Sequence, residues 1–116
     1  MADILAAALA GAELRPGVRI LPGQGNTAAI ETEAGVVVLD ASSARHVEGM
    51  LTELRGHTDA AVHAIVYSHG HHGYNASVDA WQAHNAERGD PPPRLVAHEN
   101  LPVRYARYRA LSLIHI

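Results

Sequence analysis

The sequence of 116 residues contains no cysteine, no lysine and no phenylalanine. The absence of cysteine excludes a disulfide framework and a thiolate metal site, so any metal would need His, Asp or Glu ligands. All nine cationic residues are arginine, the net charge is −3, and no basic run precedes residue 104, which argues against a nucleic-acid partner. Arg104, Arg107 and Arg109 lie at helical spacing, which is typical of the solvated face of an amphipathic helix.

A membrane segment and a secretory signal are not expected either. Residues 1–10 form an apolar, alanine-rich stretch with no positive residue before it, and the stretch is too short to span a bilayer. We expect a short helix there that packs on the domain, in a protein located in the cytoplasm. Hydrophobic residues make up 47% of a chain whose length suits one small domain, so we expect a buried core.

Apolar runs and helical stripes alternate along the chain and predict an α/β fold. Strands are predicted at 18–21, 27–32, 36–39, 61–67 and 95–97, and helices between Ser43 and Gly56, at 76–88 and after Asn100. Ser42 and Ser43 offer an N-cap for the first of these helices. The strands at 27–32 and 36–39 are expected to form a β-hairpin. This order predicts a sheet covered by helices on at least one face, with the functional site after a strand's carboxyl end, where His69–Asn75 lies.

Histidine is the unusual component of the composition, because three of the nine histidines fall within positions 69–72. His69 and His71 follow a predicted strand and are separated by Gly70. In an extended segment, side chains two residues apart point the same way, so both imidazoles can converge on Zn²⁺ or another first-row metal. Two histidines do not complete such a site, so a further ligand must come from elsewhere. The alternative is that these histidines only form hydrogen bonds that stabilise the loop.

The segment Asn26–Asp40 resembles the opening hairpin of metallo-β-lactamase-fold hydrolases, and Ser68–His71 matches the beginning of the family's H-x-H-x-D-H motif. The helix and the strand between these segments occur in the order expected for the family. A later stretch is similar to a branch that includes alkylsulfatase-like members, and comprises Pro93–Asn100, Arg104 and Tyr108. The resemblance covers about residues 18–108 and implies the N-terminal half of a metallo-β-lactamase αββα fold.

The resemblance also implies roles for individual residues. His69 and His71 fall on two ligands of the family's first zinc position, and Asp40 falls on the aspartate that supports the metal site from behind. Gly73 and Tyr74 occupy the positions of the motif's aspartate and last histidine, so the ligands expected for a second metal are missing. The resemblance therefore implies one zinc ion, with its third ligand outside this chain.

Three neighbouring side chains could contact a substrate or stabilise the loop, namely His72, Tyr74 and Asn75. The family's chemistry implies a metal-dependent hydrolase in which zinc-activated water attacks an ester or sulfate ester of a small-molecule substrate. An alternative is a non-catalytic member that keeps the fold and binds a ligand or partner through the altered loop. A third possibility is a free-standing small α/β domain, whereas an isolated half-fold would expose an apolar sheet face.

The last six residues, Leu111–Ile116, can be encoded by CTG TCT CTT ATA CAC ATC, the start of a transposon end used in sequencing-library preparation. We therefore interpret 111–116 as a translated adaptor and 1–110 as a partial metallo-β-lactamase-fold domain. The alternative is an ordinary hydrophobic strand at the terminus. On the adaptor interpretation His115 is not a candidate ligand, and His98 lies one strand away from the family's ligand position. The fragment by itself would then bind metal weakly and catalyse no hydrolysis.

Overall fold

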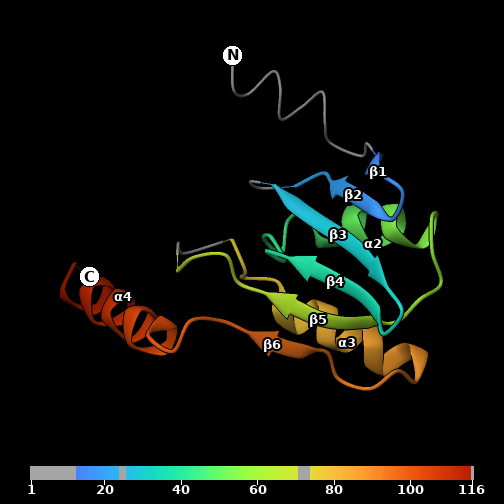
Figure 1. Ribbon diagram of the computed structural model, residues 1–116. Helices are drawn as coiled ribbons and strands as arrows, with labels where there is room; N and C mark the ends of the chain where they lie inside the picture. Colours follow the sequence, from blue (N-terminus) through green and yellow to red (C-terminus); the bar gives the residue numbers. More distant parts are fainter. Residues whose placement is uncertain (1–12, 24–25, 71–73, 116) are drawn as a thin grey trace, which may run out of the picture.

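The computed structural model describes residues 13–23, 26–70 and 74–115 (Figure 1). The segment 67–75 is called the histidine loop. The helix expected at 1–10 and three residues of this loop, His71–Gly73, lie outside the described residues. Among the described residues, no helix combines the length and the apolar character needed to cross a membrane. The elements are β1 (Glu13–Arg15), β2 (Val18–Leu21), β3 (Thr27–Thr32), β4 (Gly35–Leu39), α2 (Val47–Arg55), β5 (Val62–Val66), α3 (Val78–Arg88), β6 (Arg94–Val96) and α4 (Leu101–His115).

The six strands form one mixed sheet in chain order, from β1 to β6. Strands β1 to β4 pair antiparallel, whereas β4, β5 and β6 run parallel. The predicted hairpin is confirmed as β3–β4, in register from Thr32 opposite Gly35 to Ala28 opposite Leu39. Gly35 has a φ of +128°, and a Cβ there would lie 2.5 Å from Ala61 O, so this turn requires glycine. Strand β1 was not predicted, because its three residues are all exposed and show no apolar alternation.

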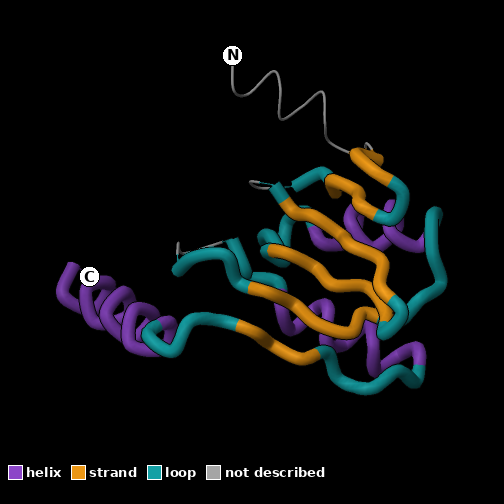
Figure 2. Tube along the Cα trace, in the orientation of Figure 1, coloured by secondary structure: helices purple, strands orange, loops and turns teal. Residues whose placement is uncertain are grey.

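Helices α2 and α3 pack on one face of the sheet, and α4 extends away from it after β6 (Figures 1 and 2). The apolar stripe predicted for the first helix is confirmed, since Val47, Met50 and Leu54 of α2 are buried. On α3, Val78 and Trp81 are buried, and Trp81 is the largest of the fully buried side chains. The predicted α/β fold, with helices on at least one face of the sheet, is therefore confirmed.

The loop between β4 and α2 differs from the predicted helix cap at Ser42 and Ser43. Helix α2 begins at Val47, its N-cap residue is His46, and no side chain caps it. Ser42 is instead buried, has a φ of +71°, and its N–H donates to Tyr74 O at 2.6 Å. The cap prediction is wrong because this loop forms hydrogen bonds with the distant histidine loop, which a local sequence pattern cannot show.

The face of the sheet opposite α2 and α3 carries two cross-strand rows of apolar side chains. The pairing register places in these rows Val18, Ile30, Val37 and Ala64, and then Ile20, Ala28, Leu39 and Val66. Their neighbours along the strands, such as Val38 and Ile65, point the other way and belong to the buried core. Within the described ranges, no helix covers these rows (Figure 1). The described residues thus form one sheet layer and one helix layer.

A polar cluster joins α2 to α3 at the beginning of β5, away from the histidine loop. Arg55 Nη1 donates to Thr58 O at 3.1 Å and to Ala60 O at 2.7 Å, and Arg55 Nε donates to His84 Nε2 at 3.0 Å. Because His84 Nε2 accepts this hydrogen bond, its imidazole is neutral in the folded chain. Burial, followed by the charges of Arg55 and Arg88, lowers the pKa of His84.

Acidification is therefore expected to destabilise the fold through His84. Because the folded pKa lies below the ordinary value of 6.5, the unfolded chain takes up the proton first, and stability falls as the pH drops through that value. Urea unfolding followed by circular dichroism at about pH 8 and about pH 5 measures the loss. The His84→Gln variant should lose this share of the pH dependence, and the exposed control His57→Gln should keep it. An unchanged pH dependence in His84→Gln would contradict the assignment.

Candidate metal site

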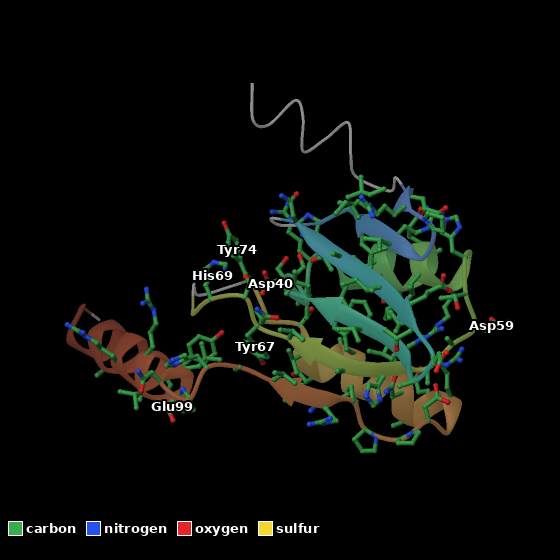
Figure 3. The ribbon with its side chains drawn as sticks, viewed as in Figure 1. Asp40, Asp59, Tyr67, His69, Tyr74 and Glu99 are labelled. Carbon is green, nitrogen blue, oxygen red and sulfur yellow. The ribbon has the colours of Figure 1, made fainter. Side chains whose placement is uncertain are left out.

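Strands β4 and β5 run parallel, so both end at the same edge of the sheet and bring two segments together (Figure 3). Asp40 follows Leu39, the last residue of β4, while Ser68 and His69 lie just beyond the end of β5. Asp40 N donates to Val66 O at 2.9 Å and thereby continues the β4–β5 pairing. The histidine loop thus leaves the sheet at a strand's carboxyl end, the usual place for a site in an open α/β sheet.

Asp40 is buried, and its carboxylate holds the histidine loop. Oδ1 accepts hydrogen bonds from Ser68 N at 2.9 Å and from Asn75 Nδ2 at 3.0 Å. Oδ2 accepts a hydrogen bond from Ser68 Oγ. The backbone of Asp40 has a φ of +61°, a left-handed conformation that Asp adopts more readily than most residues. With both oxygens engaged, Asp40 is placed to support the loop and not to bind a metal directly.

Asn75 extends this network to the loop after β4. While its Nδ2 binds Asp40, its Oδ1 accepts a hydrogen bond from Ala41 N at 2.7 Å. Ala41 O in turn accepts from Ser77 Oγ at 2.6 Å and from Trp81 Nε1 at 3.1 Å. Because all of these side chains are buried, the core contacts of α3 determine the backbone path beside the site. Asn75 therefore ties the histidine loop to Asp40 and to the backbone of Ala41.

The donors and acceptors around Ser68 determine which nitrogen of His69 carries a proton. The Ser68 hydroxyl has a single proton and donates it to the Asp40 carboxylate, which can only accept when it is ionised. Ser68 Oγ also lies 2.7 Å from His69 Nδ1, so Oγ is the acceptor there and Nδ1 carries the proton. In the neutral imidazole, Nε2 then holds the lone pair that a metal requires.

Tyr74, which the resemblance aligned with the last histidine of the motif, packs against His69. The two rings lie edge to face, with centroids 5.1 Å apart and an interplanar angle of 69°. The backbone oxygen of Tyr74 accepts the Ser42 N–H at 2.6 Å. The half-buried phenol thus restricts the ring of His69 from the side, and a neutral phenol is a poor metal ligand.

Only some of the side chains that could bind a metal belong to the described residues. Within residues 13–23, 26–70 and 74–115, no group of three or more His, Cys, Asp or Glu side chains is close enough to bind one ion. His69 offers the Nε2 lone pair, and this chemistry fits one ligand of a zinc site. The predicted second ligand, His71, and the predicted contact His72 lie outside the described residues.

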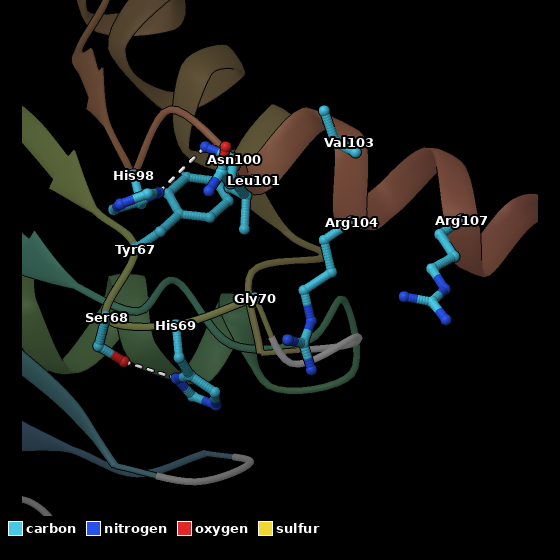
Figure 4. Close-up of a pocket in the computed structure, with 10 residues that line it drawn as sticks. All are labelled: Tyr67, Ser68, His69, Gly70, His98, Asn100, Leu101, Val103, Arg104 and Arg107. Carbon is cyan, nitrogen blue, oxygen red and sulfur yellow. Dashed lines mark hydrogen bonds between the residues drawn. The ribbon is translucent and has the colours of Figure 1, made fainter.

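A cavity of about 580 Å³ lies between the histidine loop and α4 (Figure 4). Tyr67 and His69 line it from the loop, and His98, Arg104 and Arg107 line it from the segment after β6. Arg104 and Arg107 were predicted to lie on a solvated helix face, and both are exposed on α4. Their position opposite His69 depends on the path of the chain after β6, for which the sequence pattern offered no signal.

His98 lines this cavity, but its Nδ1 lone pair is already engaged. Its Nδ1 accepts a hydrogen bond from Asn100 N at 3.1 Å, so Nε2 of the neutral ring carries the proton. Burial, followed by the influence of Tyr105 and Asp79, raises the pKa of Tyr67. The Tyr67 phenol is therefore protonated and uncharged at neutral pH.

Comparisons with known proteins support the fold. No family model and no curated protein sequence matches the chain. A solved structure of a double mutant of the sec-alkyl sulfatase PisA1 is similar to it, with a TM-score of 0.55 and 21% sequence identity. The match covers 77% of this chain but only 14% of that one. The likeness is one of fold, and the mixed sheet with its helices is consistent with a fragment of a metallo-β-lactamase-like fold.

Proposed function

We propose that this chain is part of a metal-dependent hydrolase of the metallo-β-lactamase superfamily that acts on an ester or sulfate ester of a small molecule. One zinc ion would be held by His69, by His71 and by a third ligand that does not come from this chain. The observation that carries the proposal is the hydrogen-bond chain from Asp40 through Ser68 to His69, which leaves a lone pair on His69 Nε2. A bound zinc ion lowers the pKa of its water and polarises the substrate.

The residues of this chain would act mainly by positioning. Asp40 and Asn75 keep the histidine loop against the sheet. The His69 side chain would therefore lose little conformational entropy when it binds zinc. Ser68 selects the tautomer, and Tyr74 packs on the side of His69. The sulfatase of similar fold makes a sulfate ester one candidate substrate.

Replacing His69 with alanine is expected to lower zinc affinity by at least about 100-fold, because a complete ligand is lost and not only its orientation. Isothermal calorimetry of the full gene product with a competing chelator, together with zinc analysis of the purified protein, measures the effect. His57→Ala is a matched control, because His57 is exposed and forms only a surface pair with Glu53. Equal zinc affinity in His69→Ala and His57→Ala would show that His69 is not a ligand.

A second candidate function is a non-catalytic member of the fold that binds a ligand or a partner through the altered loop. Tyr74, in the place of a motif histidine and packed on His69, favours it. Hydrolysis of p-nitrophenyl acetate and p-nitrophenyl sulfate, with added Zn²⁺, Mn²⁺ or Fe²⁺ and then with a chelator, separates the two in the full gene product. Metal-restored activity that the chelator abolishes would exclude the non-catalytic function.

A further inference from the structure

Helix α4 approaches the histidine loop at Gly70, where the absence of a side chain makes room for Arg104 (Figure 4). A Cβ on Gly70 would lie 2.5 Å from Arg104 Cδ, 3.1 Å from Arg104 Nε and 3.1 Å from Leu101 Cδ1. Contacts below 3.0 Å are not tolerated, so any other residue at this position would displace Arg104. The stem of Arg104 therefore lies directly over the loop that carries His69.

The charged and polar groups around the cavity favour an anion. Arg104 and Arg107 both line the cavity, and each guanidinium carries a permanent positive charge. His98 also lines the cavity, and its Nδ1 accepts a hydrogen bond from the Asn100 backbone. Among the described residues that line the cavity, none is Asp or Glu. An anion that enters the cavity would meet cations and donors and no carboxylate on its walls.

The same cavity also has an apolar side. Leu101 and Val103 line it from the first turn of α4, and the Tyr67 ring lines it from the end of β5. Val103 is 70% exposed, so water covers most of this apolar side chain in the unliganded cavity. A ligand that carries both a charge and a short hydrocarbon chain would cover this surface, whereas an inorganic ion would not.

We propose that this cavity binds a small organic anion, with the guanidinium of Arg104 on its charged group and Leu101 and Val103 on its hydrocarbon chain. The inference rests on the proposed function only where it makes this anion the substrate of the site at His69. A planar guanidinium matches two oxygens of a carboxylate, sulfonate or sulfate group. Arg104 would thus determine which substrates the site accepts.

Calorimetry on the metal-free chain in chelator and low salt tests the site without any catalysis. The probes are hexanesulfonate, which has no ester bond to cleave, inorganic sulfate, and hexylammonium as the probe of opposite charge. Each buried methylene tightens binding about fourfold, so hexanesulfonate should bind at least about tenfold more tightly than inorganic sulfate. Hexylammonium should show no binding. Comparable affinity for all three probes, or for the two anions, would overturn the proposal.

Variants locate the bound anion. Arg104→Gln should weaken hexanesulfonate binding by about three- to tenfold, the range for an exposed charge-assisted contact. Gly70→Ala should weaken it as well, because the added Cβ displaces Arg104 while leaving its charge in place. Arg94→Gln removes the same charge from exposed strand β6, outside the cavity lining, and should change binding less than about twofold. Equal losses in Arg104→Gln and Arg94→Gln would mean a general charge effect and would overturn the site.

The failure of this inference can be told apart from the failure of the proposed function. Zinc binding that depends on His69, together with no hexanesulfonate binding, would reject the anion site and leave the metal site standing. Hexanesulfonate binding that depends on Arg104, together with a full gene product that binds no zinc at His69, would reject the metal site and leave the anion site standing. Tyrosine fluorescence gives a second measure of hexanesulfonate binding, because Tyr67 lines the cavity.

Discussion

Replacing Asp40 with asparagine is expected to weaken zinc binding by about 10- to 100-fold, the usual effect of losing a group that orients a metal ligand. Asparagine keeps an oxygen for Ser68 N and Asn75 Nδ2, and it tolerates the positive φ, so the loop should stay folded. Its Nδ2, however, is a donor where the carboxylate accepted from Ser68 Oγ. The Ser68 hydroxyl must then turn its proton toward His69 Nδ1, which moves the proton of the ring to Nε2.

Nitrogen-15 NMR of the histidine rings in the metal-free protein, at about pH 8, observes this change directly. Asp40→Asn should convert His69 from the Nδ1–H to the Nε2–H tautomer, while Ser68→Thr, which keeps the hydroxyl, should leave it unchanged. Zinc affinity is then measured on the full gene product by calorimetry with a competing chelator. An unchanged tautomer in Asp40→Asn would contradict the role of Ser68. A converted tautomer with full zinc affinity would instead remove His69 from the ligand set.

Truncating Trp81 to alanine is expected to lower the free energy of unfolding by about 3–5 kcal/mol, the usual range for a buried aromatic side chain. Trp81 is 0% exposed and lies between α3 and the sheet, so its truncation leaves a cavity in the close-packed core. The truncation also removes the hydrogen bond from Trp81 Nε1 to Ala41 O, next to Asp40. Urea unfolding followed by circular dichroism measures the loss.

More conservative variants separate packing from hydrogen bonding at this position. Trp81→Phe keeps most of the volume, and Ala41 O still accepts from Ser77 Oγ, so we expect a loss of about 1–2 kcal/mol. Ser77→Ala alone similarly leaves the tryptophan bond. The double variant leaves a buried carbonyl without a partner and should cost about 1 kcal/mol more than the sum of the two. Strict additivity would show that water reaches Ala41 O.

The order and type of the elements could be predicted from the sequence because each follows from spacing along a short segment. Strand β2 occurs where a short apolar run predicted it, at Val18–Leu21, and strand β3 where a loose apolar alternation predicted it, at Thr27–Thr32. The stripe of α2 and the end of α3 at Gly89, which has a φ of +77°, likewise follow from local pattern. The exposed strand β1 has no such pattern and was missed.

The candidate site could be predicted only in part. The position of His69 after a strand is a local property, and the resemblance to metallo-β-lactamase-fold hydrolases added Asp40 as a supporting residue. Ser68 was not singled out, although a hydroxyl next to the histidine was the available signal. Ser42 was expected to cap a helix, but it is buried against the histidine loop. His71 and His72 stay predictions, as does zinc.

The sequence by itself determined most of the segments that become strands and helices, and that a histidine loop follows a strand, because side-chain spacing and turn residues act within a few positions. Only the tertiary structure decided how Asp40 reaches Ser68 and Asn75, which lie 28 and 35 positions away. Those contacts depend on the parallel pairing of β4 with β5, and the tautomer of His69 depends on them. The contact between Gly70 and Arg104 likewise depends on where α4 lies. Hydrogen bonds and van der Waals contacts act over a few ångströms, so they follow distance in space and not separation along the chain.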